Sequence, residues 1–211
     1  MRVALIHALR HSPPPIEAAF RAEWPGASLM NLLDDSLSAD LAREGRLTEA
    51  MTARFLTLAR YAAGTGARGI LFSCSAFGPC IEACAADLAP LPVLKPNEAA
   101  IEEAVAAGRR IGLLATFPGT LASMPAEFPP GVEVVPCLAE GALAALDAGD
   151  AAAHDRLAAE AAAALRGRCD VVLLGQFSLA RAAPRVSAAT GLPVVTTPGS
   201  AVRKLKSLLA G

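Results

Sequence analysis

The sequence predicts an α/β protein made of two similar doubly wound lobes, each with a parallel sheet of about four strands, and three observations support this prediction. Apolar runs of strand length alternate with helical stretches along the chain. The order of these segments in the first half returns in the second half. Hydrophobic residues make up 54% of the chain and charged residues 18%, which is below the roughly 25% of a typical domain. Many helices are therefore expected to be covered on both sides or rich in alanine.

Three pairs of matching segments carry the internal duplication. In order along the chain, they are RVALIH (2–7) with RIGLLA (110–115), GILFSCSAFGP (69–79) with VVLLGQFSLAR (171–181), and LPVLKP (91–96) with LPVVTTP (192–198). Three matches in one order are hard to obtain by chance. The two halves are therefore expected to share one topology.

The segments between these matches complete the pattern. Each half adds one short apolar segment, SLMNLL (28–33) or VEVVPCL (132–138), and then a helical stretch, 47–64 or 151–167. Each half thus reads β-α-β-α-β-α-β. Continuous Val/Ile/Leu strands that alternate with helices predict parallel sheets covered on both faces and joined by right-handed crossovers.

The expected lobe boundaries follow from the duplication. The first lobe takes residues 1–95 and is joined by the C-terminal helix, 196–211, and the second lobe takes residues 96–195. The apolar run from Val3 to Leu9 is too short for a membrane span and lacks a small-residue cleavage pattern. We interpret it as the first strand and expect a cytoplasmic protein.

Composition narrows the class of partner. The net charge is −1 and the pI is about 6.3, and the basic residues are scattered apart from the C-terminal RKLK, so nucleic acid is not an expected partner. The five cysteines show no paired spacing for a disulfide framework or a zinc site, so we expect free thiols. A small molecule is the expected ligand, and a homo-oligomer stays open.

Four loops are the expected place for chemistry. Ligands of open parallel sheets bind beyond the carboxyl ends of the strands. Four apolar strands are each followed by a polar residue that begins a loop, and these residues are His7, Cys74, Thr116 and Gln176. Two lobes related by a pseudo-twofold axis would gather these ends in one site between them.

Cys74 is the most reactive residue type among the four. Gly78 and Pro79 open the next helix, so we expect the thiol near a helix N-terminus, where free backbone N–H groups favour a thiolate. The same N–H groups, with the hydroxyl of Ser73 or Ser75, would bind a carboxylate or an enolate. The alternative is a buried structural cysteine.

Three motifs resemble the aspartate/glutamate/hydantoin racemase superfamily over essentially the whole chain. They are FSCSAFG (72–78), LLATFPGTLASM (113–124) and DVVLLGQFSLAR (170–181). The resemblance implies two lobes, no metal or pyridoxal cofactor, and acid/base chemistry at the carbon next to a carboxylate. In two-base members, two cysteines on opposite walls remove and return the proton.

The resemblance assigns roles to particular residues. The first family cysteine falls on Cys74, Ser75 and Ala76 supply backbone N–H groups, and Thr116 falls where a hydroxyl binds the substrate carboxylate. The second cysteine falls on Gln176, whose side-chain amide has no acid/base chemistry near neutral pH. A one-base reaction follows as an expectation, in which Gln176 only hydrogen-bonds the substrate.

Further candidates surround these positions. Ser178 is expected to donate to substrate or to cap a helix. Phe117 and Phe177 are expected to line an apolar part of the site or to pack in the core. His7 is expected to relay a proton or to be hydrogen-bonded by the backbone. Asp34, Asp35, Ser36 and Ser38 follow the second strand and could reach the site, but such a cluster before a helical run more often provides turn and cap residues. Cys80 and Cys84 are expected to pack.

The expected activity is therefore that of a cofactor-independent racemase-like isomerase acting on a small carboxylate, an amino acid or its derivative. Two alternatives stay open. One is a lyase that loses carbon dioxide and needs a single thiol, although the cysteine of the arylmalonate decarboxylases falls at the second position instead of the first. The other is a carboxylate-binding protein without turnover.

Overall fold

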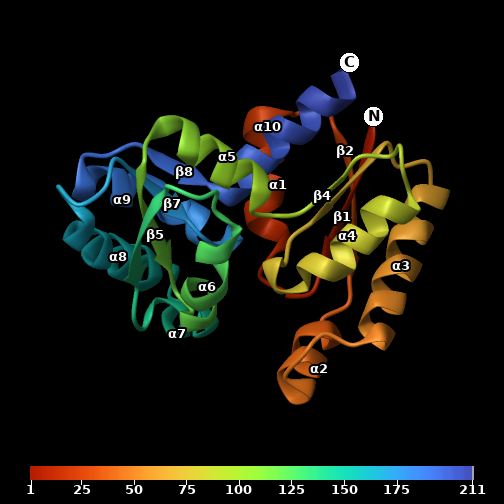
Figure 1. Cartoon of the computed structure of the whole chain (residues 1–211), viewed down its shortest axis with the longest axis horizontal. Helices are drawn as coiled ribbons and strands as arrows, with labels where there is room; N and C mark the ends of the chain where they lie inside the picture. Colours follow the sequence, from red (N-terminus) through yellow and green to blue (C-terminus); the bar gives the residue numbers. More distant parts are fainter. Residues whose placement is uncertain (211) are drawn as a thin grey trace. The chain divides into compact units, whose positions relative to one another are not determined.

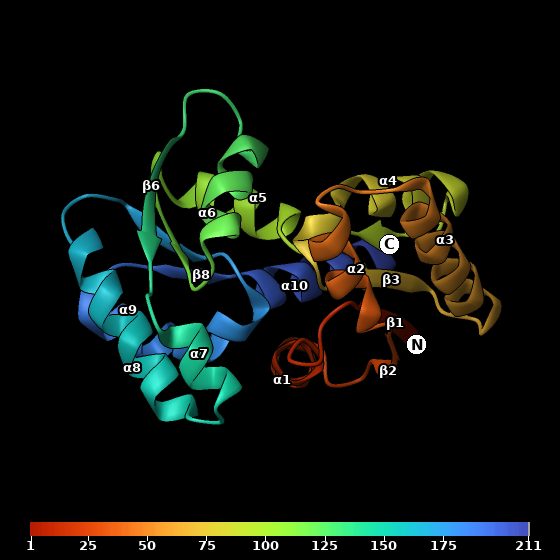
Figure 2. The same ribbon diagram turned by 90° about the horizontal axis from the view of Figure 1, so that it is seen from below.

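The computed structural model describes residues 1–210 and divides the chain into two compact units (Figures 1 and 2). The first unit holds Met1–Asn97 together with the chain from Ala201 onward, and the second holds Glu98–Ser200. Each unit is a lobe with a four-stranded parallel sheet and helices on its faces. Both the predicted fold class and the predicted duplication are confirmed.

The first lobe is built on a sheet with the strand order β2-β1-β3-β4. Its strands are β1 (Arg2–His7), β2 (Ser28–Leu33), β3 (Gly69–Phe72) and β4 (Val93–Leu94). Its helices are α1 (Pro13–Glu23), α2 (Ser36–Glu44), α3 (Glu49–Gly64), the 3-10 turn η1 (Ser75–Phe77), α4 (Gly78–Asp87) and the part of α10 (Thr197–Ala210) that begins at Ala201.

Alternate residues of the first sheet face two different layers, because side chains of a strand alternate between its faces. Ala4, Ile6, Ile70 and Phe72 join one core with the buried faces of α3 and α4, which lie next to each other in Figures 1 and 2. On the other face, a Cβ at Gly69 would lie 2.9 Å from the Leu205 side chain of α10. This contact explains the glycine.

The second lobe repeats this order as β6-β5-β7-β8. Its strands are β5 (Arg110–Ala115), β6 (Glu133–Leu138), β7 (Val171–Leu174) and β8 (Val194–Thr196). Its helices are α5 (Glu98–Ala107), α6 (Pro118–Ser123), η2 (Met124–Glu127), α7 (Ala142–Asp147), α8 (Ala151–Ala162), η3 (Ala163–Leu165), η4 (Phe177–Ala182) and α9 (Ala183–Thr190), followed by the first residues of α10.

The second sheet also has a core on each face. One core joins Leu114, Val172 and Leu174 to α8 and α9, which Figure 2 shows next to each other. The opposite core joins Leu113 and Leu173 to the alanine-rich face of α5 and to other side chains of the lobe. Alanine lets α5 approach this face closely, as the composition predicts. No helix within residues 1–210 is long and apolar enough to cross a membrane.

Candidate active site

Cys74 lies just beyond the carboxyl end of β3, where the strand passes into the turn η1 and then into α4. Its backbone is extended (φ −124°, ψ 114°), and the helical turn starts at the next residue. The side chain is half-buried and packs at the edge of the first core. Its side chain makes no cap hydrogen bond to the turn, but the backbone N–H of Ala76 and the hydroxyl of Ser38 are near enough to its sulfur to lower the thiol pKa.

The prediction that this position favours a thiolate is wrong for the protein without a ligand. Burial raises the pKa of the Cys74 thiol above its ordinary value of 9.0, and the nearby N–H of Ala76 and hydroxyl of Ser38 only partly offset this effect. The helical turn supplies too few donors to outweigh the lost hydration of a charged sulfur. The resting group is therefore a protonated thiol at neutral pH.

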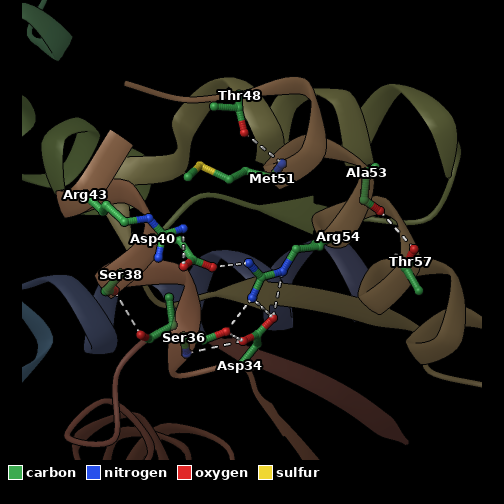
Figure 3. A network of polar contacts seen from close by, with 11 residues as sticks. Asp34, Ser36, Ser38, Asp40, Arg43, Thr48, Met51, Ala53, Arg54 and Thr57 are labelled. Atoms are coloured by element: carbon green, nitrogen blue, oxygen red, sulfur yellow. Dashed lines mark hydrogen bonds and ion pairs between the residues drawn. The ribbon is translucent and has the colours of Figure 1, made fainter. Parts of the chain in front are cut away.

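Ser38 reaches this thiol from α2, a helix that buries little of its own surface. Leu37 is buried and Leu41 is half-buried against the first core, and polar contacts also hold the helix. Arg54 of α3 donates to Asp34 at 2.5 Å and to Asp40 at 2.6 Å, and these contacts are drawn in Figure 3. We call Arg54, Asp34, Asp40 and Ser36 the α2 clasp, because Arg54 also donates to the hydroxyl of Ser36 at 2.6 Å.

Of the roles predicted for the residues before α2, the structure shows the turn but no side-chain cap, because Asp35 at the N-cap makes no cap hydrogen bond. Asp34 accepts from the backbone N–H of Ser36 at 3.3 Å and from its hydroxyl at 2.6 Å, which is a turn contact. Ser38 donates to the carbonyl of Ala8 at 2.9 Å. Because a hydroxyl has one proton, Ser38 stabilises a thiolate only when it turns away from Ala8.

His7 lies on the opposite face of the same sheet edge and is 1% exposed. Its Nε2 is 2.9 Å from Oδ1 of Asn31, and its Nδ1 is 2.8 Å from the hydroxyl of Ser73. Asn31 in turn donates to the carboxylate of Glu17 at 2.7 Å. This donor leaves Oδ1 of Asn31 as an acceptor, so Nε2 of His7 carries the proton and Ser73 donates to Nδ1.

Both ring nitrogens of His7 are therefore engaged within the lobe. Burial lowers the pKa of His7 below its ordinary value of 6.5, and the opposing effects of Asn31 and Glu17 are smaller. His7 is thus neutral at physiological pH. Its role as a substrate-binding or relay residue stays a prediction.

In the second lobe, Thr116 and Gln176 lie at the ends of the neighbouring strands β5 and β7 and bind each other. Oε1 of Gln176 accepts from the backbone N–H of Thr116 at 2.6 Å and from its hydroxyl at 2.9 Å. Thr116 is 7% exposed and Gln176 is half-buried. Both donors of Thr116 are therefore directed at Gln176, and its predicted contact with a substrate carboxylate stays a prediction.

The other predicted site residues differ in exposure. Phe117 is 53% exposed, whereas Phe177 is 5% exposed and lies in the interior. Ser75 and Ser178 are half-buried, and Ala76 is exposed at the tip of η1. Cys80 and Cys84 are fully buried in the first core, as predicted for packing residues.

Sequence reasoning missed Asn31, Glu17 and Arg54. Asn31 did give a signal, since it is the polar residue within the apolar segment SLMNLL. Glu17 and Arg54 gave none, because charged residues on helices are usually solvated. Within residues 1–210, no three His, Cys, Asp or Glu side chains are grouped as a metal site.

Comparison with known proteins places the chain in a family. The family model described as Asp/Glu/Hydantoin racemase matches residues 14–205. The chain therefore belongs to the Asp/Glu/hydantoin racemase family. No curated protein matches it in sequence.

Solved structures share its fold. Allantoin racemase from Klebsiella pneumoniae is 22% identical with a TM-score of 0.75, and the match covers 100% of this chain and 88% of that one. Aspartate racemase from Picrophilus torridus is 11% identical with a TM-score of 0.74, over 99% and 94% of the two chains. Glutamate racemase from Francisella tularensis, solved with D-glutamate, is 14% identical with a TM-score of 0.68, over 99% and 81%.

Proposed function

We propose that this protein is a cofactor-independent isomerase that moves a proton at the carbon next to a carboxylate, in an amino acid or a derivative of one. Cys74 is the acid/base group. The observation that carries the proposal is a half-buried cysteine at the end of β3, next to the N–H of Ala76, in a member of a racemase family. Allantoin, glutamate and aspartate racemases among the solved structures support the substrate class.

The proton transfer proposed for Cys74 is a carbon-acid step. The thiolate takes the proton from the carbon, and the electron pair of the C–H bond moves onto the carboxylate or carbonyl oxygen as an enolate. Backbone N–H groups of the turn at Ser75 and Ala76 donate to this oxygen. The thiol then returns its proton to the carbon: return to the original face regenerates the substrate, and return to the opposite face, after the planar enolate turns over in the site, gives the isomer.

The raised pKa of Cys74 suits this step once the thiolate forms. A thiolate with a higher pKa is a stronger base, and the C–H next to a carboxylate is a weak acid. Because the thiol must lose its proton before it acts as a base, the rate of α-proton exchange is expected to rise with pH until the pH exceeds 9.0, the ordinary thiol pKa.

Proton NMR in deuterated water tests the proposal directly. Aspartate, glutamate, allantoin, hydantoins, maleate and an arylmalonate are each incubated with the wild type, with Cys74→Ser and with Cys137→Ser. Cys137 is the matched control, since this half-buried thiol donates to the carbonyl of Ala161 in the second lobe.

The expected result is loss of the α-proton signal for at least one acid with the wild type and with Cys137→Ser. Cys74→Ser should lower that rate by at least about 100-fold, as loss of an acid/base group does. Loss of signal that continues at the wild-type rate in Cys74→Ser contradicts the proposal. No exchange with any acid leaves carboxylate binding without turnover as the better account.

A lyase that releases carbon dioxide is the second candidate, and the protonated resting state of Cys74 favours it. In such a reaction the enolate forms when carbon dioxide leaves, so the protein needs a proton donor but no base. One protonated thiol supplies that donor. Release of ¹³C-labelled carbon dioxide from a labelled malonate, abolished by Cys74→Ser, would separate this reaction from isomerisation.

A further inference from the structure

We infer that Gln176 is a fixed hydrogen-bond donor to an oxygen of the substrate, a role that rests on the proposed function and adds a catalytic group to it. The resemblance to two-base racemases places a second thiol at this position. The contacts of Gln176 point instead to a group that binds negative charge on oxygen and transfers no proton.

The orientation of the Gln176 amide follows from its partner. A backbone N–H can only donate, so the atom 2.6 Å from the N–H of Thr116 is the oxygen Oε1. The hydroxyl of Thr116 donates to the same oxygen at 2.9 Å. These two bonds leave the nitrogen Nε2 on the other side of the amide.

The two N–H groups of Nε2 have no acceptor among the residues that the structure describes. Gln176 is half-buried and its Nε2 is not one of the buried side-chain atoms without a partner, so its N–H groups reach solvent and are open to a ligand. Since N–H groups only donate, that ligand must offer an acceptor, and carboxylate and enolate oxygens are strong acceptors.

The backbone around Gln176 is fixed as well. Its carbonyl accepts from the N–H of Leu179 at 3.1 Å, which closes the turn η4. Directly before it, a Cβ at Gly175 would lie 3.0 Å from Leu113 and 3.3 Å from Met124, so this strand end is tightly packed. A donor held in place in this way needs little reorganisation as charge develops on the substrate oxygen.

The chemical consequence concerns the number of bases. An amide neither takes nor gives a full proton near neutral pH, so Gln176 cannot be the second base. Its N–H groups can stabilise a substrate oxygen that becomes negative when a proton or carbon dioxide leaves. The reaction is then a one-thiol reaction with a fixed donor to the enolate oxygen.

The first test uses a feature of the sequence, which contains a single glutamine. Protein labelled with ¹⁵N-glutamine gives one pair of side-chain N–H signals, assigned by their loss in Gln176→Glu. Titration with malonate and with succinate is expected to shift both signals. If this pair stays in place with every carboxylate tested, the inference is wrong, whatever the activity of the protein.

The second test measures the reaction with Gln176→Glu. Glutamate keeps an oxygen for Thr116 and replaces the N–H donors with an acceptor of nearly equal size. The rate of α-proton exchange is expected to fall by about 100-fold or more, as loss of one such donor does elsewhere. Glu160→Gln, at an exposed ion pair with Arg156, is the matched control for exchanging an acid and an amide.

The two tests separate the inference from the proposed function. A wild type without exchange for any acid counts against the proposed function, while the glutamine signals still decide the inference. A wild type that exchanges, with Gln176→Glu at the same rate, overturns the inference and leaves the role of Cys74 intact.

Discussion

At the scale of single residues, His7 shows how a buried polar side chain is kept neutral. Its ring lies under the edge of the first sheet, with Ser73 on one nitrogen and Asn31 on the other. Protonation would place a second hydrogen on Nδ1, and Ser73 would have to turn its own proton away. Burial makes this charge unfavourable, which is why the pKa of His7 is lowered.

His7 is therefore expected to make the first lobe sensitive to acid. Above pH 6.5 neither the folded nor the unfolded state binds the proton, so the contribution to stability is complete. As the pH falls from 6.5 through the lowered folded pKa of His7, the unfolded chain binds a proton that the folded lobe does not, and stability is lost.

Urea unfolding at several pH values checks this prediction. The free energy of unfolding of the wild type should fall as the pH decreases below 6.5, and this slope should be smaller in His7→Gln. Asp34 also has a lowered pKa, but the stability that its ionised carboxylate contributes is lost only below pH 3.8, its ordinary pKa. The effects of His7 and Asp34 therefore fall in separate pH ranges. Equal slopes in both proteins contradict the account of His7.

At the scale of elements, the position of α2 depends on the α2 clasp. Arg54 binds the carboxylates of Asp34 and Asp40. Burial raises the pKa of Asp34, but the hydrogen bonds from Ser36 and Arg54 outweigh burial and hold this pKa below 3.8. The Arg54 side chain is 34% exposed, so water weakens its ion pair with Asp34 to about 1 kcal/mol or less. Several weak contacts together fix a helix with one buried leucine.

Removal of the clasp should loosen α2 before it affects the rest of the lobe. In Arg54→Gln, the backbone amides of residues 36–44 should exchange with deuterated water roughly fivefold faster, as loss of about 1 kcal/mol predicts. Arg60→Gln is the matched control, because Arg60 lies on the same helix and binds Asp87 instead. Equal protection of α2 in both variants would show that the clasp does not hold it.

Ser38 connects α2 to the thiol, so its loss should lower the reactivity of Cys74. In Ser38→Ala the thiolate loses one donor, and alkylation of Cys74 by iodoacetamide at a fixed pH should slow by about fivefold. The rate is followed by mass spectrometry of the peptide that carries Cys74. An unchanged or faster reaction indicates that Ser38 serves only the carbonyl of Ala8.

At the scale of the whole molecule, the duplicated sequence accounts for both sheets. Equivalent segments form equivalent strands, as RVALIH and RIGLLA do in β1 and β5, because a buried parallel strand is specified by a short run of apolar residues. The strand ends then position Cys74, Thr116 and Gln176 without further information. This part of the candidate site was predictable.

The contacts of these residues were not predictable from the sequence. The pairing of His7 with Asn31 depends on the register of β1 with β2, and the contact of Ser38 with Cys74 depends on where α2 packs. The raised pKa of Cys74 depends on how much water its sulfur loses, which a sequence does not contain.

The return of α10 to the first lobe is a testable feature of the chain as a whole. Leu205 is fully buried and lies against Gly69, whereas Leu208 is 50% exposed. Leu205→Ala should destabilise the first lobe by about 2–5 kcal/mol, and Leu208→Ala by much less. The single tryptophan, Trp24, is in this lobe, so its fluorescence during urea unfolding reports the change. A Trp24 transition that does not move in Leu205→Ala contradicts this assignment.

The central claim, one thiol with an amide donor in place of a second thiol, is tested most directly by where deuterium first appears. One pure enantiomer of the best substrate is incubated in deuterated water. At early times the two enantiomers are separated, and the deuterium content of each is measured by mass spectrometry. The account predicts deuterium in both enantiomers from the earliest times, including the remaining starting enantiomer, because one thiol that exchanges with solvent serves both faces of the enolate. Gln176→Cys should raise the share of label in the opposite enantiomer. Label that enters only the opposite enantiomer of the wild type from the earliest times would show two bases and contradict the account.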